Sequence, residues 1–574
     1  MSTLLFVSIV VLILFVFYVL NVILKYLNAQ ECRVPVRDSS KSHHWMVVSA
    51  FPVGHYCNVC KLATSHGAQC DFCGVVVDRG CLREANKRYR CKQLSQIDED
   101  ETYKIHHHWV NGNLPPGCLC AVCEQVCGDG PGIRDRRCVW CHRAVHTACA
   151  SNLGRLCDYG DARRIIVPPT CVVLKKLGWK HRRLTVIERI EIDVALSTIK
   201  QWSPVIVVAN RRSGNGDGER VLHAFRRFLN PVQVIDLAEV RPEVGLRWCH
   251  LLSGVAEFRV LVAGGDGTIG WVLSAVEQLN LQPKPLIGLL PLGTGNDLSR
   301  SLGWGSGHSG DVDAAQAARE LMQAVPVNLD RWSINICPRR RFGIRQPDKT
   351  LRMSNYFSVG VDAAVTLNFH NTRDTLPRAM SSRFINKMLF FTYGTADVLE
   401  RTCAGLSSRI QLLLDGNPVE LPALEGIVVL NIAHWGAGVQ PWTMCSELYS
   451  AATGHEHLCV ERPPPLQQFD DGKLEVFGVY SSFHIAQLQV GVGEPFRIGQ
   501  AETVTIRCVQ RPVPMQCDGE PWLQPPAVVH VRRHGQALLL ASPEHAAVSP
   551  HLNSPVGSGS QSSSSPKTGR PQFF

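Results

Sequence analysis

The pattern of apolar and polar residues changes several times along the chain, and each change predicts a different kind of structure. From Trp202 onward, short apolar runs end in glycine turns, as in PVIVVANRRSG, FRVLVAGGDGT and PLIGLLPLGTGND. Helical stretches such as residues 268–279 separate these runs. Continuous apolar runs joined by helices are typical of buried parallel strands with crossover helices. Residues 201–335 are therefore predicted to form an α/β domain built on a parallel sheet.

Beyond about Asp330 the apolar residues begin to alternate with polar ones. The segments RWSINI, EGIVVLNIA, KLEVFGVY and ETVTIRCV have the alternation of strands with one buried face. They predict a second, mostly antiparallel β domain over residues 336–545. The last residues, 546–574, are rich in serine, glycine and proline and are predicted to be a disordered tail.

An apolar stretch without a charged residue covers residues 4–24. As a helix it would be about 30 Å long, the thickness of the hydrocarbon core of a bilayer. No basic segment precedes it, whereas basic residues follow it, so an uncleaved anchor is favoured over a cleaved signal peptide. Basic residues on the C-terminal side also favour a cytosolic C-terminus. Residues 1–28 are therefore predicted to be a single-pass transmembrane anchor, in the endoplasmic reticulum, the plasma membrane or both.

Length and charge add little to this division. A chain of 574 residues should hold several domains, since one domain usually has about 100–200 residues. The formal charge of +10 suits an anionic membrane surface or a phosphorylated ligand, and it would equally suit nucleic acid. Net charge alone therefore does not decide the partner.

Cysteine is more specific. Most of the 23 cysteines fall between Cys57 and Cys157, in Cys-x-x-Cys pairs interleaved with histidine, which indicates zinc sites and not a disulfide framework. Zinc thiolates require a reducing compartment, in agreement with a cytosolic orientation. Two small zinc modules are predicted, over residues 40–95 and 104–160. A linker over 161–200 follows, and its basic part is expected to be solvated, with contact to membrane phosphates as the alternative.

The second module has eight candidate ligands, enough for two tetrahedral zinc sites. They are His107, Cys120, Cys123, Cys138, Cys141, His146, Cys149 and Cys157. The first module repeats the pattern with Cys57, Cys60, Cys70, Cys73, Cys81 and Cys91. His43 or His44 precedes these cysteines, and Asp78 stands where a second histidine would be expected. We expect Asp78 to be a zinc ligand, with a three-ligand or water-completed site as the alternative.

The turn Gly264-Gly265-Asp266-Gly267-Thr268 directly follows an apolar run and precedes an amphipathic segment. Glycines allow the backbone to approach phosphate oxygens, and the N–H groups at the start of a helix attract anions. An aspartate beside phosphates is unfavourable unless it meets Mg²⁺ or accepts a proton from an attacking hydroxyl. Taken alone, a glycine turn after a strand more often only ends the strand and binds no ligand. The chain has no P-loop, and Glu219 replaces the last glycine of a dinucleotide-binding pattern.

These motifs together resemble the diacylglycerol kinase family. The resemblance includes VIVVANRRSGNGDG, the turn around Asp266, and PLGTGNDL over residues 291–298. In the second half it includes NYFSVG, NIAHWGAG, DDGKLEV and DGEP, so it covers residues 43–540 in order. The second zinc module resembles the diacylglycerol/phorbol finger of protein kinase C. That resemblance implies one zinc on His107, Cys138, Cys141 and Cys157, and another on Cys120, Cys123, His146 and Cys149.

The family resemblance implies transfer of the γ-phosphoryl group of ATP to diacylglycerol, with Mg²⁺, and up to four structural zinc ions. Asp266 would be the essential acid and Asp471 a candidate base, although Asp471 has a competing interpretation as a turn residue. The candidate nucleotide-binding residues are Ser213, Gly214, Gly264, Gly265, Gly267, Thr268, Gly293, Thr294, Gly295 and Asn296. Diacylglycerol and membrane lipids are the expected partners, and nucleic acid is not.

The resemblance also bears on finer questions. Two zinc fingers, an N-terminal apolar stretch and no EF-hand calcium loop look most like the epsilon branch of the family, which is associated with arachidonoyl-containing diacylglycerol. The fingers lack the full loop pattern of lipid-binding members, so a structural or regulatory role is favoured over independent lipid sensing. The alternatives are a related kinase acting on sphingosine or ceramide, and a non-catalytic lipid-binding scaffold.

Overall fold

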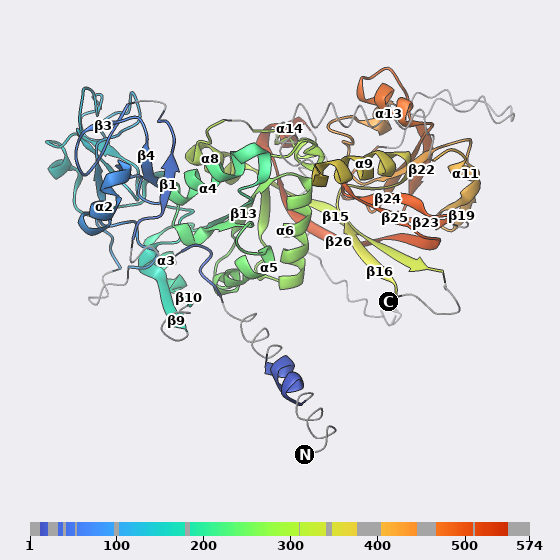
Figure 1. The fold of residues 1–574 in the computed structure, drawn as a ribbon, viewed down its shortest axis with the longest axis horizontal. Helices are drawn as coiled ribbons and strands as arrows, with labels where there is room; N and C mark the ends of the chain where they lie inside the picture. The colour runs from blue at the N-terminus through green and yellow to red at the C-terminus, as the bar shows by residue number, and fades with distance from the viewer. Residues whose placement is uncertain are drawn as a thin grey trace, which may run out of the picture.

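The computed structural model describes residues 12–20, 32–37, 42–51, 54–96, 103–177, 184–308, 310–339, 347–375, 403–444, 466–508 and 511–548. Figure 1 shows an elongated molecule, with the cysteine-rich modules at one end, a sheet flanked by helices in the middle and a β-rich lobe at the other end. The described part thus has the multidomain α/β and β organisation that the sequence predicts.

The predicted anchor is described only over residues 12–20, which form a short helix with exposed apolar side chains. This helix projects away from the rest of the molecule (Figure 1). Within the described residues, no helix is both long enough and apolar enough to cross a bilayer. The other residues of the predicted anchor lie outside the described part of the chain.

The central sheet contains four adjacent parallel strands, as the apolar runs predict. In spatial order they are β12 (Val234–Asp236), β11 (Val205–Ala209), β13 (Arg259–Gly264) and β14 (Leu286–Pro291). Every residue of β11 and β13 is buried because helices cover both faces. One face packs against α4 (Asp217–Phe228) and α8 (Ala314–Gln323), and the other packs against α6 (Asp266–Leu279).

Two long strands connect this sheet to the β-rich lobe. β15 (Val325–Pro338) pairs antiparallel with β26 (Ala527–Ala541) along its whole length, and β26 also joins the edge of β14. The sheet then continues through β23 (Thr503–Cys508), β18 (Ile410–Leu414) and β19 (Asn417–Val419), while β16 (Lys349–Met353) pairs with β15. The predicted domain boundary at residues 335 and 336 therefore falls inside a strand that both lobes share.

A second sheet faces this extension. Its strands are β22 (Phe496–Ala501), β21 (Leu474–Val479), β20 (Gly426–Leu430), β17 (Tyr356–Gly360), β24 (Val513–Cys517) and β25 (Glu520–Gln524), and all their pairings are antiparallel. A core around Trp332, Phe357 and Val529 lies between the two sheets. On this lobe the alternating pattern correctly predicts antiparallel strands.

The predicted linker over residues 161–200 is a folded segment in its described part. It contains a hairpin of β9 (Val172–Leu177) and β10 (Leu184–Ile190), followed by α3 (Ile192–Thr198). Ile165 and Ile166 are buried, and the carbonyl of Ile165 accepts the N–H of Val205 at the start of the central sheet. The basic residues on the hairpin point outward, as in the exposed pair of Lys175 and Glu188.

The predicted tail also begins too early, because α14 (Pro543–Val548) extends into it. The remainder of the tail lies outside the described residues.

Candidate active site

Three loops meet at one edge of the central sheet. Residues 210–216 follow β11, residues 265–268 follow β13, and residues 292–297 follow β14. Because these strands are parallel and adjacent, their carboxyl ends lie at the same edge. In open α/β sheets this edge is where ligands bind. The sequence therefore placed the candidate nucleotide-binding residues in loops that the fold does bring together.

The loops around Asp266 and Asn296 approach each other closely. A Cβ atom placed on Gly293 would lie only 2.6 Å from the Cα of Gly265, and one on Gly264 would lie 2.6 Å from the Cβ of Thr268. No side chain fits at these glycines without displacing backbone or a neighbouring side chain. The close packing of the two loops at the start of α6 therefore requires glycine at both positions.

Asn296 has a different role from the predicted contact to phosphate or ribose. It adopts a left-handed conformation with φ of 55°. Its Oδ1 accepts the N–H of Gly293 at 3.0 Å, and its Nδ2 donates to the carbonyls of Gly293 and Ser306, both at 2.9 Å. The side chain is buried, so it holds the loop in shape and is not presented to a ligand.

Asp266 is the first residue of α6, and its carboxylate turns back into the protein. Oδ2 accepts the N–H of Asp297 at 3.1 Å, and Oδ1 accepts the N–H of Leu298 at 3.2 Å. The side chain of Asn355, from the β-rich lobe, is a further hydrogen-bonding partner. Burial raises the pKa of Asp266, although these hydrogen bonds oppose the increase. The carboxylate is thus held at the junction of the two lobes.

Asp297 is a second buried carboxylate beside Asp266, and the sequence analysis did not select it. Its Oδ2 accepts the N–H of Ala437 at 3.2 Å, whereas its Oδ1 is buried with no hydrogen-bond partner among the described residues. Burial and the neighbouring charge of Asp266 raise the pKa of Asp297 to about 7. Two adjacent carboxylates with raised pKa values are the arrangement expected for a divalent cation or a shared proton. The sequence signal that could have identified Asp297 is its place at the end of the motif PLGTGND.

The β-rich lobe supplies the opposite wall of this site. The buried carboxylate of Asp518 accepts the N–H groups of Ser354, Asn355 and Tyr356 at 2.7–3.0 Å and so fixes the turn that carries Asn355. Burial raises the pKa of Asp518 to about 6. From the same DGEP segment, Oε1 of Glu520 would lie 4.0 Å from a Cβ placed on Gly267. Asn355 and Glu520 were not selected from the sequence, although both lie in segments that carry the family resemblance.

Asp471, the predicted base from this lobe, lies in other surroundings. Its Oδ1 accepts the N–H of Lys473 at 2.9 Å, and the nearby charge of Asp330 contributes to a raised pKa, after burial. The next residue, Gly472, has φ of 76° and donates its N–H to Asp330 at 2.6 Å. These contacts favour the turn interpretation of Asp471, and a role as base stays a prediction.

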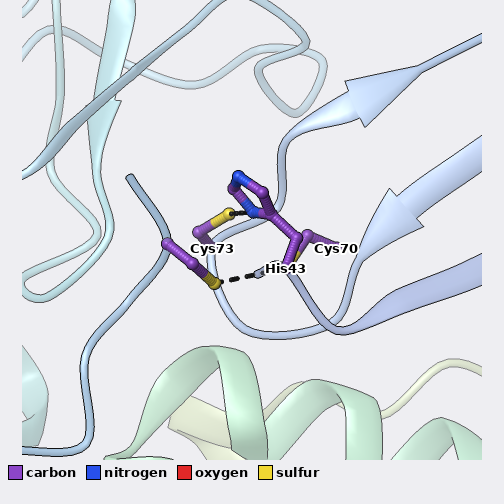
Figure 2. A group of neighbouring side chains, drawn as sticks. His43, Cys70 and Cys73 are labelled. Carbon is purple, nitrogen blue, oxygen red and sulfur yellow. Dashed lines mark hydrogen bonds between the residues drawn. The ribbon is translucent and has the colours of Figure 1, made fainter. Parts of the chain in front are cut away.

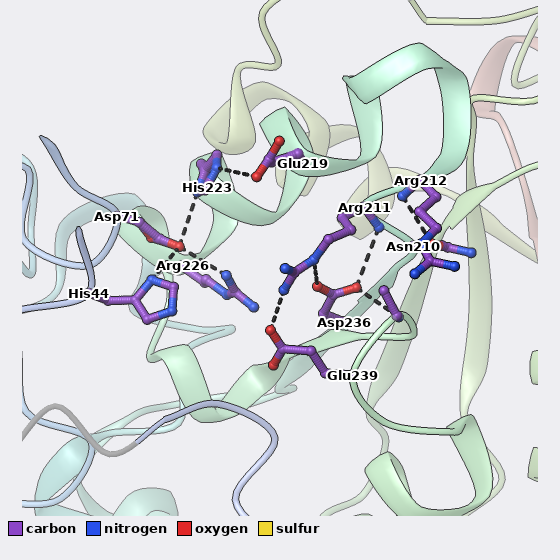
Figure 3. Close-up of polar contacts among 11 residues, drawn as sticks. His44, Asp71, Asn210, Arg211, Arg212, Glu219, His223, Arg226, Asp236 and Glu239 are labelled. Atoms are coloured by element: carbon purple, nitrogen blue, oxygen red, sulfur yellow. Dashed lines mark hydrogen bonds and ion pairs between the residues drawn. The ribbon is translucent and has the colours of Figure 1, made fainter. Parts of the chain in front are cut away.

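The predicted phosphate loop around Ser213 and Gly214 is braced to the edge of the sheet (Figure 3). The guanidinium of Arg211 forms ion pairs with Asp236 and Glu239, and the side chain of Asn210 accepts the N–H of Arg212 at 3.0 Å. The loop leads directly into α4. A displacement of α4 would therefore also displace the candidate phosphate loop.

The cysteine-rich modules contain the predicted zinc-ligand sets, with one correction. His43, Cys70, Cys73 and Cys91 form a buried group, in which His43 Nδ1 lies 3.2 Å from Cys73 Sγ (Figure 2). The structure thus selects His43 and not His44. The second module gathers its ligands as the resemblance implies: His107, Cys138, Cys141 and Cys157 in one group, and Cys120, Cys123, His146 and Cys149 in the other. Thiolates and imidazoles within 4.8 Å of one another fit tetrahedral Zn²⁺.

The correction concerns Asp78. The fourth group contains Cys57, Cys60 and Cys81 but not Asp78. Oδ1 of Asp78 instead accepts the N–H of Gly80 at 2.9 Å, as the N-cap of a short 3₁₀ helix over Arg79–Cys81. A short acidic side chain is well suited to capping, and this role draws the carboxylate away from the sulfur atoms. The three-ligand alternative is the one that the structure supports.

Both modules dock on the end of α4, the second through His142 and the carbonyl of Phe228. Figure 3 shows the ion-pair contacts of the first. In the first, Asp71 forms ion pairs with Arg226 at 2.9 Å, His223 at 3.0 Å and His44 at 3.2 Å. Although Asp71 is buried, these partners hold its pKa well below the usual range. The buried Nζ of Lys92 donates to the carbonyls of Arg227 and Leu229, at 2.7 and 2.6 Å. Burial lowers the pKa of Lys92 to about 7, and its Nζ serves as a hydrogen-bond donor to carbonyls that have no partner within the helix.

Three family models match the chain. The phorbol esters/diacylglycerol binding domain (C1 domain) matches residues 107–160, the diacylglycerol kinase catalytic domain matches 204–330, and the diacylglycerol kinase accessory domain matches 352–521.

Curated relatives give the same result. Probable diacylglycerol kinase 3 of Caenorhabditis elegans is 31% identical over 87% of this chain and 64% of its own length. Diacylglycerol kinase 2 of Arabidopsis thaliana is 31% identical over 82% of this chain and 78% of its own length. Diacylglycerol kinase iota of Homo sapiens is 31% identical over 85% of this chain. The chain spans less than two thirds of the first of these relatives and about half of the human one.

Proposed function

Because the chain belongs to the diacylglycerol kinase family, we propose that it transfers the γ-phosphoryl group of ATP to the free hydroxyl of a 1,2-diacylglycerol, giving phosphatidic acid and ADP. The observation that carries this proposal is the buried pair of Asp266 and Asp297, at the junction of the glycine-containing loops after β13 and β14 with the second lobe. Such a transfer depends mainly on positioning and on neutralising phosphate charge.

The residues present fit a magnesium ion. The oxygen of Asp297 that has no partner among the described residues is a free hard ligand next to a second carboxylate. Asp266 and Asp297 would hold Mg²⁺, which when bound neutralises charge on the phosphates. The N–H groups that open α6 after Gly265 would bind phosphate oxygens, and Asp266 would orient the acceptor hydroxyl or take its proton.

The membrane assignment is part of the same proposal. It is supported by the uncharged stretch over residues 4–24 and by the helix at 12–20, whose apolar side chains are exposed. We place the protein as a single-pass protein of the endoplasmic reticulum, the plasma membrane or both, with the catalytic part facing the cytosol. The cysteine groups support structural Zn²⁺, up to four ions, on the cytosolic side.

Membership of the epsilon branch, and with it a preference for arachidonoyl chains, rests on the sequence resemblance alone. The relatives above include an iota form and do not single out that branch. A panel of diacylglycerols that differ only in the second acyl chain tests it. Equal specificity constants for arachidonoyl and oleoyl species would contradict the assignment.

The central experiment is a mixed-micelle assay of the purified full chain with ATP and Mg²⁺. The acceptors are diacylglycerol, monoacylglycerol, ceramide and sphingosine, so a sphingoid kinase would be recognised directly. Asp266→Asn should reduce kcat by at least about 10³-fold, since it removes the charged carboxylate, and circular dichroism should show that the variant remains folded. Asp297→Asn should raise the Mg²⁺ concentration required for half-maximal activity. Near-wild-type activity of Asp266→Asn would refute the assigned role.

A further inference from the structure

One exposed apolar patch lies on the β-rich lobe. It consists of Tyr480, Phe483, Val490 and Val492, on α13 (Ser482–Gln489) and the residues around it, and is called here the α13 patch. Val490 and Val492 are 67% and 73% exposed, in a turn with the sequence VGVG. Apolar groups gathered on a surface in this way mark a site of interaction.

The patch is held rigidly from beneath. Ile485 and Leu488 on the inner face of α13 are buried. The imidazole of His484 accepts the N–H of Tyr480 at 3.1 Å through Nδ1, and its Nε2 lies 2.9 Å from the carbonyl oxygen of Glu494. His484 thus ties together both ends of the segment. The outward position of the valines is therefore a property of a closed, hydrogen-bonded segment and not of a loose loop.

The segment is also without charge at its surface. Residues 478–493 have the sequence GVYSSFHIAQLQVGVG, which contains no Asp, Glu, Lys or Arg. Burial lowers the pKa of His484, so this side chain is neutral as well. Protein interfaces commonly surround their apolar centre with a polar rim. The patch has no charged residue within 478–493, and the exposed Glu494 lies just beyond it, so its apolar side chains can enter a lipid phase while the nearest charge in the sequence stays in water.

The position of the patch links it to the active site. Gln489, at the end of α13, approaches the loop over residues 435–439, since its Nε2 would lie 3.6 Å from a Cβ on Gly436. The next residue of that loop, Ala437, donates its N–H to Asp297. In Figure 1, α13 lies at the outer margin of the β-rich lobe. The patch is therefore separated from the carboxylate pair by one loop.

We propose that the α13 patch inserts into the surface of a lipid bilayer and brings the acceptor entrance of the active site to the membrane. This inference rests on the proposed diacylglycerol kinase activity, because a diacylglycerol with two long acyl chains stays in the lipid phase. A patch beside the site allows such an acceptor to reach Asp266 without crossing water. This surface is distinct from the N-terminal stretch, which would hold the protein near the membrane but would not orient the lobe.

A kinetic experiment separates access to lipid from chemistry. The full chain with Val490→Asp and Val492→Asp is compared with wild type on long-chain diacylglycerol in vesicles and on a short-chain diacylglycerol dispersed in water. Activity in vesicles should fall about tenfold, as a higher KM in surface concentration, because insertion depends on buried apolar area. Activity on the dispersed acceptor should stay within about twofold. The control is Leu523→Asp on β25, at the opposite edge of the sheet, where Leu523 is 55% exposed.

A second measurement detects insertion directly. Val492→Trp and, as control, Leu523→Trp are placed separately in the full chain, which has 12 native tryptophans, and the wild-type signal is subtracted. Vesicles with brominated acyl chains should quench the added tryptophan at position 492 and not the one at 523.

Several results would overturn the proposal. Unchanged vesicle activity of the aspartate variant, equal loss on both acceptors, or equal quenching at the two positions would each do so. A dependence on position 492 seen in cells but absent with purified protein and vesicles would point to a protein partner instead. If wild type phosphorylates neither acceptor, the proposed function fails, whereas the quenching still reports on insertion.

Discussion

Each cysteine-rich module contains one metal-ligand group that faces α4 and one that faces solvent. In the first module, His43, Cys70, Cys73 and Cys91 are all buried, whereas Cys60 in the other group is exposed. The second module repeats the contrast, with the outer group formed by Cys120, Cys123, His146 and Cys149. We call these the inner and outer groups. The same types of metal ligand thus occur once against the catalytic domain and once at the surface of each module.

The difference lies in what the neighbouring residues contact. Asp71 lies between two inner cysteines of the first module and binds Arg226 of α4. Lys92 follows the inner Cys91, and its ammonium donates to the last carbonyls of α4. In the second module, His142 follows the inner Cys141 and contacts the carbonyl of Phe228 at 3.2 Å. Since α4 begins at the candidate phosphate loop, the inner groups support the catalytic domain. The outer group of the first module is braced differently, because Tyr56 and Asn58 beside Cys57 hydrogen-bond to Asn113 and Asn111 of the second module.

The largest contrast is expected from removing one ligand from each group of the first module. Cys73→Ser should release the inner zinc and unfold the module, because metal binding supplies most of the folding free energy of such small domains. Kinase activity should then fall at least about tenfold, since α4 loses its support. Cys60→Ser should cost one zinc but keep more than about half of the activity. Zinc content, activity and melting temperature are measured for both variants. Equal losses of activity in the two would contradict the difference between the inner and outer groups.

A smaller effect is expected at Lys92. Lys92→Met keeps the apolar stem but leaves at least two buried carbonyls without their donor, which should destabilise the protein by about 2–4 kcal/mol. Zinc content should remain at the wild-type level, which separates this change from the cysteine variants. Chemical denaturation monitored by tryptophan fluorescence gives the free energy of unfolding. A change below about 0.5 kcal/mol would mean that the contact does not hold α4.

The ion pair at Asp71 provides a matched test of burial. Asp71→Asn preserves the shape and removes the charge from Arg226, and a cost of about 1–3 kcal/mol is expected. The control is Asp158→Asn, since Asp158 forms an exposed pair with Arg143. Exposed pairs contribute about 0–1 kcal/mol. Equal costs for the two variants would show that the docking contact behaves like a surface ion pair.

The smallest effect concerns the outer group of the first module. With three cysteines it should lose zinc at lower chelator concentration than the four-ligand groups, and Asp78→His should increase its retention by adding an imidazole ligand. Loss of the cap on the 3₁₀ helix should partly offset the gain. Metal content during chelator titration of the full chain checks both statements. A lower zinc occupancy in Asp78→His would show that capping outweighs ligation.

Much of this structure follows from local sequence. Ligand spacing is a short-range property, so it predicted the eight zinc ligands of the second module, and the family resemblance supplied their division into two groups. The strand and turn around Asp266 were predictable for a similar reason, since an apolar run followed by glycines restricts the backbone locally. The choice of Asp266 as the essential acid also required the family resemblance, and its role stays a prediction. These features are encoded locally, the strand and turn within residues 259–268 and the zinc ligands within residues 107–157.

Other features depend on contacts between residues far apart in the chain. Asn355 and Asp297 meet at Asp266 only because β26 returns from the C-terminal part of the chain to pair with both β14 and β15. Tertiary contacts decide that His43 and not His44 joins the cysteine group. They also decide that Asp78 caps a 3₁₀ helix and is not a zinc ligand.

Lys92 reaches the carbonyl of Leu229 across 137 residues of sequence, and no local pattern specifies such a pairing. Sequence alone determined which segments could bind metal or phosphate, because those propensities arise from neighbouring residues. The tertiary structure decided which of them act together, because burial and electrostatic pairing depend on the whole fold.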